Sequence, residues 1–122
     1  MSFIGIKLFD SELKVMEVLW EEGDVTAGQL AKILTEETGW NRNTTYTVIK
    51  KLIDKGAVER REPNFTCKAL ITKGQVQEQE TTELINKIFD GSNELFFSAF
   101  INDKNLTKSE IEKLKKIVEN LQ

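Results

Sequence analysis

Three glycines divide the first half of the chain into short amphipathic segments, and this division constrains the fold more than any other feature. Gly23, Gly39 and Gly56 each follow a run of apolar residues spaced three or four apart. Such spacing is typical of a helix with one buried face, and glycine commonly follows a helix's last residue. The sequence therefore predicts three short helices joined by tight turns.

The residues around these glycines predict where each helix begins and which face it buries. The first helix is expected from about Ser11 to Glu22. The expected N-caps are Asp10 or Ser11 for the first helix, Thr26 in a capping box with Gln29 for the second, and Asn41 or Asn43 for the third. The expected buried faces are Leu13, Met16, Leu19 and Trp20, then Ala27, Leu30, Ile33 and Leu34, then Thr45, Val48, Ile49 and Leu52.

After Gly56 the pattern changes from helical to alternating. Ala57–Arg61 and Phe65–Ile71 are expected to form two strands, joined by a turn that contains Pro63. Proline fits the turn because it cannot donate a hydrogen bond to a strand ladder. Three helices followed directly by a hairpin are the element order of a winged helix-turn-helix domain, here residues 1–71.

In such a domain the third helix enters the DNA major groove and the hairpin contacts the sugar-phosphate backbone. Residues 41–61 carry six basic and two acidic side chains, a local charge of +4 within a chain of net charge −3. A basic window of this kind favours nucleic-acid binding over the alternative of an ordinary solvated helix face. The candidate DNA-binding residues are Arg42, Asn43, Thr44, Tyr46, Thr47, Lys50, Lys51, Arg60 and Arg61.

Residues 72–122 are predicted to be helical, with capping-box patterns beginning at Thr72 and Thr107 and a stop at Gly91. About 50 residues make a poor core alone, so we expect this region to pair with the same region of a second chain. The alternative is that it folds back on the first domain. The candidate dimerisation residues are Leu84, Ile88, Phe96, Phe97, Phe100, Ile111, Leu114, Val118 and Leu121. The predicted fold class is mainly α with a small β-hairpin.

The composition argues against an enzyme, a metal site or a cofactor. The chain has no histidine and one cysteine, Cys67, which we expect to be a buried strand residue rather than a redox sensor. Without histidine the chain lacks the commonest general base and cannot form a His/Cys zinc site. No stretch is apolar enough to span a membrane, and Met1–Lys7 lacks a signal-peptide pattern, so we expect a cytoplasmic protein.

Several stretches resemble the penicillinase and methicillin-resistance repressors of Gram-positive bacteria. They are Leu13–Trp20 (LKVMEVLW), Gly39–Thr47 (GWNRNTTYT), Leu52–Gly56 (LIDKG) and Leu106–Ile111 (LTKSEI). The resemblance implies a homodimer that binds a palindromic operator in double-stranded DNA and regulates a β-lactam-resistance operon. It also implies that Thr44 and Thr47 contact the operator. Family members commonly carry proline and lysine where this chain has Arg42 and Asn43.

The resemblance further implies a partner and a switch. In antibiotic-responsive members, a membrane sensor protease leads to cleavage of the repressor at an asparagine–phenylalanine bond in the dimerisation region. Ala99 and Phe100 stand at the matching positions here, so the asparagine is replaced.

Two other function classes remain open from the sequence. The first is a winged-helix regulator that senses a small molecule at the dimer interface, where Phe96, Phe97 and Phe100 could line a pocket. The second is a protein-interaction module that binds no nucleic acid, against which the Arg60–Arg61 pair and the basic window argue.

Overall fold

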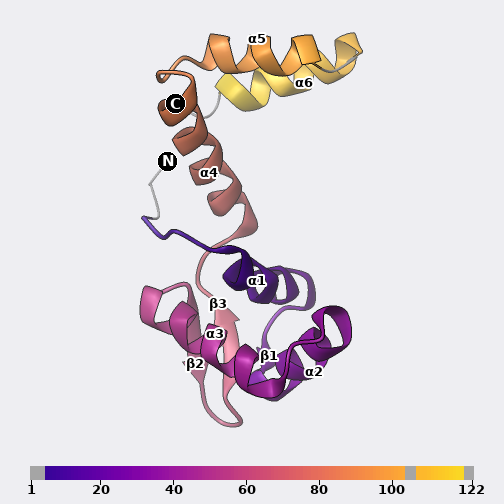
Figure 1. The fold of residues 1–122 in the computed structure, drawn as a ribbon, viewed down its shortest axis with the longest axis vertical. Coiled ribbons are helices and arrows are strands. Elements are labelled where there is room, and N and C mark those ends of the chain that lie inside the picture. The colour runs from indigo at the N-terminus through magenta and orange to yellow at the C-terminus, as the bar shows by residue number, and fades with distance from the viewer. Residues whose placement is uncertain (1–4, 104–106, 120–122) are drawn as a thin grey trace. The chain divides into compact units, whose positions relative to one another are not determined.

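The computed structural model describes residues 5–103 and 107–119, which divide into two compact units. The first unit runs to Lys73 and the second begins at Gly74. The elements of the first unit are α1 (Asp10–Glu22), β1 (Val25–Thr26), α2 (Ala27–Thr38), α3 (Arg42–Lys55), β2 (Val58–Arg61) and β3 (Thr66–Ala69) (Figure 1). Helices α4 (Lys73–Ile88), α5 (Asn93–Asp103) and α6 (Lys108–Glu119) follow.

The ends of the second and third helices are those that the sequence predicts. Thr26 and Gln29 form the capping box of α2, in which the Gln29 amide donates to the Thr26 hydroxyl at 3.1 Å. Asn41 caps α3 by accepting from the Thr44 amide at 2.8 Å. Gly39 and Gly56 end these helices in the left-handed conformation, with φ of 77° and 83°, where a side chain would be strained.

The start of the first helix differs from the prediction. The N-cap of α1 is Phe9, so the expectation of a cap at Asp10 or Ser11 is wrong. The side chain of Glu12 reaches back and accepts a hydrogen bond from the Phe9 amide at 2.8 Å. The backbone amide of Phe9 therefore has a hydrogen-bond partner in the Glu12 carboxylate, although Phe9 itself has no polar side chain to act as a cap.

Packing of the three helices forms the core of the first unit. All four residues predicted for the inner face of α3 are buried. In α1 the predicted Met16 and Leu19 are buried, together with Val15 and Val18, which were not predicted. Leu13 and Trp20 are half-buried. Trp20 stays at the edge because its indole Nε1 donates to the Ile71 carbonyl oxygen at 2.9 Å. In α2, Ala31 is buried in place of Ile33.

A small antiparallel sheet with strand order β1-β3-β2 completes the first unit. The predicted hairpin is present, although its strands are shorter than expected and leave Ala57, Phe65 and Leu70–Ile71 outside them. Strand β1 was not predicted because two residues are too few to show alternation. It pairs with the hairpin through Val25 opposite Cys67 and Thr26 opposite Thr66.

Cys67 lies on the central strand and is fully buried, as the sequence predicts. Burial raises the pKa of its thiol to about 11, because the charged thiolate is poorly solvated there. The thiol therefore stays protonated and unreactive near neutral pH.

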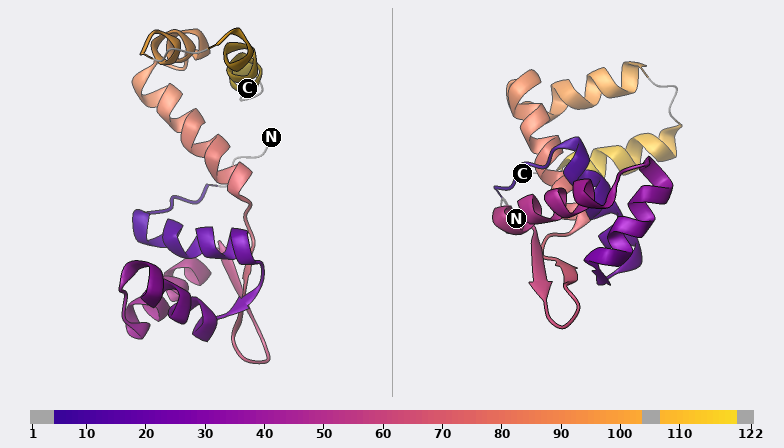
Figure 2. Two further views of the ribbon diagram at one scale, coloured as in Figure 1. Left: turned by 90° about the vertical axis from the view of Figure 1, so that its right-hand side faces the viewer. Right: turned by 60° about the horizontal axis from the view of Figure 1, so that its bottom comes forward.

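The second unit is entirely helical in its described residues. Helix α6 runs back in the direction opposite to α5 (Figure 2), and the two helices contact each other. The capping box predicted at Thr107 is present, with the Glu110 amide donating to the Thr107 hydroxyl at 3.2 Å. Among the described residues, none of the helices is long and apolar enough to cross a membrane.

A buried ion pair ties the end of α3 to the start of α1. The Glu12 side chain is only 2% exposed, and its Oε1 accepts from Lys55 Nζ at 2.6 Å. The same ammonium donates to the Lys7 carbonyl oxygen at 2.8 Å and lies 4.5 Å from the centre of the Phe9 ring. Within the described residues the other Glu12 oxygen has no hydrogen-bond partner, so Lys55 provides the compensating charge for this carboxylate.

We expect Lys55→Met to lower the free energy of unfolding by about 2 kcal/mol, because it leaves the Glu12 carboxylate buried without a cation. Lys55 keeps 29% of its surface exposed, so we place the loss below that of a fully buried pair. Urea denaturation followed by circular dichroism measures it. The matched control is Lys73→Met, which breaks an exposed pair with Glu17 and should cost less than about 1 kcal/mol. Equal losses in the two variants would contradict this role of Lys55.

Candidate nucleic-acid interface

The exposed face of α3 presents the polar side chains that the sequence singled out. Because the opposite face is buried, Asn43, Thr44 and Thr47 are all exposed, as are Lys50 and Lys51. The Thr44 hydroxyl lies 3.1 Å from Asn41 Oδ1, and the Thr47 hydroxyl donates to the Asn43 carbonyl oxygen at 2.9 Å. The first two turns of α3 therefore carry exposed hydroxyl and amide groups, and the middle of the helix carries the ammonium groups of Lys50 and Lys51.

Arg42 and Tyr46 form a contacting pair at the start of the same helix. Arg42 Nη2 donates to the Tyr46 hydroxyl at 2.9 Å, and the guanidinium carbon lies 5.0 Å from the centre of the Tyr46 ring. The pair is four residues apart, so both side chains project from one side of α3. Both groups also approach Gly28 of α2, where an added Cβ would lie 3.9 Å from Arg42 Nη2 and 4.0 Å from the Tyr46 hydroxyl.

The hairpin places the two predicted wing arginines next to acidic side chains. Arg60 Nε donates to Glu62 Oε1 at 2.7 Å, and Arg61 Nη2 lies 3.5 Å from Glu59 Oε2. The hydrogen bond from Arg60, and then that from the Phe65 amide, lower the pKa of Glu62, so its carboxylate stays charged at neutral pH. All four side chains are at or near the protein surface, where such pairs are weak. The arginines can therefore exchange these partners for phosphate.

Phe65, which was predicted only as the first residue of a strand, contacts the candidate interface residues. Its ring makes an edge-to-face contact with Tyr46, with ring centres 5.9 Å apart, and the Arg60 guanidinium carbon lies 3.9 Å from the ring centre. Phe65 therefore contacts two of the predicted site residues, Tyr46 and Arg60, and Tyr46 in turn contacts Arg42. The sequence feature that could have identified Phe65 is its place as an aromatic residue directly after the turn that follows Arg60 and Arg61.

The predicted dimerisation residues lie in all three helices of the second unit. Leu84 and Ile88 of α4 are exposed, whereas Phe96 and Phe97 of α5 and Ile111 of α6 are half-buried. Phe96 makes an edge-to-face contact with Phe89, with ring centres 5.4 Å apart. Ala99 is exposed in α5. Phe100, Leu114 and Val118 belong to α5 or α6, but their side chains are outside the described part of the structure, and Leu121 lies outside the described residues altogether.

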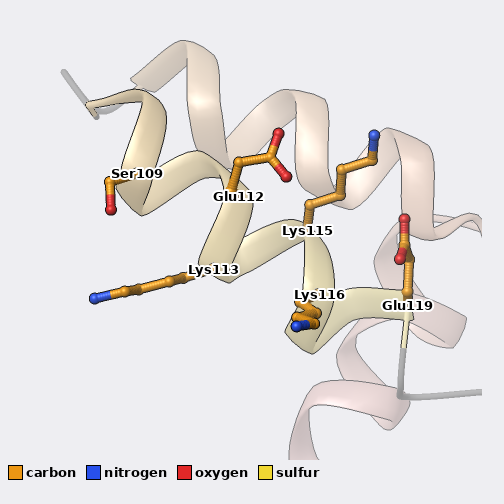
Figure 3. Close-up of a pocket in the computed structure, with 6 residues that line it drawn as sticks. All are labelled: Ser109, Glu112, Lys113, Lys115, Lys116 and Glu119. Carbon is orange, nitrogen blue, oxygen red and sulfur yellow. The ribbon is translucent and has the colours of Figure 1, made fainter.

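No metal site is found among the described residues, because within them no group of three or more acidic or cysteine side chains could hold a metal ion. A surface hollow at α2 and the start of α3 is lined by Gly28, Ala31, Lys32, Thr35, Glu36 and Arg42. A hollow on α6 is lined by Ser109, Glu112, Lys113, Lys115, Lys116 and Glu119 (Figure 3). All of these belong to one helix and their side chains point in different directions, so they do not converge on a ligand.

The comparisons with known proteins agree with this geometry. A family model described as penicillinase repressor matches residues 8–120. The methicillin resistance regulatory protein MecI of Staphylococcus aureus (strain N315) is 24% identical over 114 residues, which is 92% of this chain and 93% of that protein. The penicillinase repressor of Bacillus licheniformis is 25% identical over 115 residues, or 93% of this chain and 90% of that protein.

A solved structure matches the chain as well. It is described as the solution structure of the DNA binding domain of the repressor BlaI, with a TM-score of 0.54 and 27% sequence identity. The match covers 62% of this chain and 93% of that chain. This likeness and the observed elements confirm the predicted fold class, a mainly helical chain with a small sheet and a winged helix-turn-helix domain.

Proposed function

Because the chain belongs to the penicillinase repressor family, a family of transcriptional repressors rather than enzymes, we propose that it is a homodimeric repressor of a palindromic operator. The observation that carries the proposal is the outward face of α3, where base-reading Asn43, Thr44 and Thr47 adjoin Lys50 and Lys51. Threonine and asparagine can hydrogen-bond base edges, while lysines neutralise phosphates. The wing arginines supply further backbone contacts.

We assign a separate task to each part of the chain. Residues 1–71 form the DNA-binding domain, and residues 72–122 form the dimerisation domain. One DNA-binding domain alone makes half of the operator contacts, whereas the two DNA-binding domains of a dimer are linked and bind with a high effective concentration. Repression is then steric, because the dimer occupies the promoter. The names of MecI and the penicillinase repressor support a β-lactam-resistance operon as the target. We propose a cytoplasmic location because that is where the operator DNA lies.

The first test is a gel shift on the promoter DNA upstream of the chain's own gene, across a salt series. We expect selective binding over a scrambled duplex of equal length. The logarithm of the affinity should fall linearly with the logarithm of salt, by about 0.9 for each phosphate neutralised. Equal binding to both duplexes at every salt concentration would contradict the proposal and favour a protein-interaction module instead.

The dimer is tested by Ile88→Asp. Ile88 is 59% exposed, and a charge there should prevent an apolar helix face from pairing. We expect sedimentation to show a monomer and the affinity for a full operator to fall about 100-fold, as avidity is lost. Binding to a single half-site should not change. The matched control, Asn86→Asp, adds the same charge at a neighbouring exposed position of α4; if it dissociates the dimer equally, the Ile88 surface is not the interface.

We also propose that a membrane sensor protease ends repression by cleavage between Ala99 and Phe100. Ala99 is exposed on α5, inside the proposed dimerisation domain, so a cut there would remove part of α5 and all of α6. In cells treated with a β-lactam, mass spectrometry should find a fragment that ends at Ala99 and another that begins at Phe100. Untreated cells are the control. Induction of the target genes with the chain intact would rule out this switch.

A further inference from the structure

Phe65 holds a backbone conformation that a bulky side chain rarely adopts. Its φ is 52°, and that of its neighbour Asn64 is 69°. Asparagine tolerates the left-handed region, whereas an aromatic residue there is strained and needs compensation from its surroundings. The contacts of Phe65 therefore have to compensate for this backbone conformation.

The ring of Phe65 joins the hairpin to α3. On one side it meets the Tyr46 ring at 5.9 Å and an interplanar angle of 80°, the edge-to-face arrangement that aromatic pairs prefer. On the other side the Arg60 guanidinium carbon lies 3.9 Å from the ring centre, within the range of a cation–π contact. Arg42 contacts Tyr46 in turn, with its guanidinium carbon 5.0 Å from that ring centre. A guanidinium thus stands at each end of an aromatic pair.

The backbone of Phe65 adds a third connection. Its carbonyl oxygen accepts a hydrogen bond from the Ala27 amide, the first residue of α2, at 2.9 Å. In addition, its amide points to Glu62 Oε2 at 3.5 Å, while Glu62 Oε1 accepts from Arg60 Nε at 2.7 Å. A guanidinium carries five N–H donors, so the bond to Glu62 is compatible with a phosphate bound to the terminal nitrogens of Arg60.

We propose that Phe65 is a positioning residue that couples the β2–β3 hairpin to α3. It would hold Arg60 and Arg42 at a fixed spacing, so that the two arginines bind phosphate together as one clamp. The ring restricts the Arg60 guanidinium directly, and the Arg42 guanidinium through its contact with Tyr46, so less freedom is lost when the two arginines bind the DNA backbone. Base contacts by α3 and phosphate contacts by the hairpin are then energetically coupled. This inference rests on the proposed function and adds a residue that none of the predicted contacts includes.

The test is Phe65→Gly, measured by fluorescence anisotropy on the same promoter duplex across a salt series. Glycine accepts the left-handed backbone, so the turn is kept while the ring is removed and the net charge is unchanged. We expect operator affinity to fall about tenfold and the salt slope to become shallower by about one. The matched control is Asn64→Gly, which relaxes the adjacent left-handed residue and should keep wild-type affinity and slope.

A double-mutant cycle separates positioning from general weakening. In the wild-type background Arg60→Ala should lower affinity about tenfold, whereas in the Phe65→Gly background it should change affinity less than about twofold. Equal losses in both backgrounds, or wild-type affinity and slope for Phe65→Gly, would overturn the proposal.

Two further controls keep the test decisive. If Phe65→Gly gives no cooperative thermal transition, Phe65→Leu replaces it with the same expectations, because leucine keeps apolar bulk but has no ring face. Wild-type protein that shows no selective, salt-dependent binding would overturn the proposed function itself. If the wild type binds selectively but Phe65→Gly keeps the same affinity and salt slope, only the proposed role of Phe65 is overturned.

Discussion

The burial of one face of α3 determines what the rest of the first unit can present. Val48, Ile49 and Leu52 pack inward with Thr45, against α1, α2 and the hairpin. Because successive residues of a helix are 100° apart, fixing this face also fixes the direction of the other. The end of α3 is held independently by the Lys55–Glu12 pair. The polar face is therefore rigidly displayed, which is what recognition of base edges requires, since misplaced hydrogen-bonding groups lose specificity as well as affinity.

The electrostatics of this surface suit a protein whose net charge is negative. The overall charge of −3 gives no long-range attraction for DNA, so the basic window must act at short range. Arg60 and Arg61 each have a carboxylate neighbour, Glu62 and Glu59. Exposed pairs of this kind add little stability. Under the proposed function, the carboxylates of Glu59 and Glu62 reduce nonspecific attraction, because a phosphate must replace a carboxylate before the arginine contributes.

The two units differ in the way that the proposed function requires, with DNA binding assigned to the first and dimerisation to the second. The first unit has a closed core and an exposed polar face. The second leaves Leu84 and Ile88 of α4 and Leu95 of α5 exposed. A second copy that covers this surface would also double the DNA contacts. Under the proposed function, dimerisation is a natural point of control, because a monomer would keep α3 unaltered but make only half of the operator contacts.

The sequence by itself determined the parts of the fold that depend on neighbours along the chain. Helix ends followed from Thr26, Asn41, Gly39 and Gly56, because capping groups act within three or four residues. The inner face of α3 followed from its periodicity. The position of Phe9 as the first cap did not follow, since it depends on a Glu12 side chain whose partner, Lys55, lies 43 residues away.

Only the tertiary structure decided how the predicted site residues are linked. Arg42 and Arg60 lie in different elements, and no local rule places Tyr46 against Phe65. The two-residue strand β1 likewise exists only because β3 offers it a partner. The left-handed backbone of Phe65 runs against local preference, and contacts from three elements maintain it. Periodicity and capping therefore predict which residues face the solvent, whereas the packing of distant segments decides which of them act together.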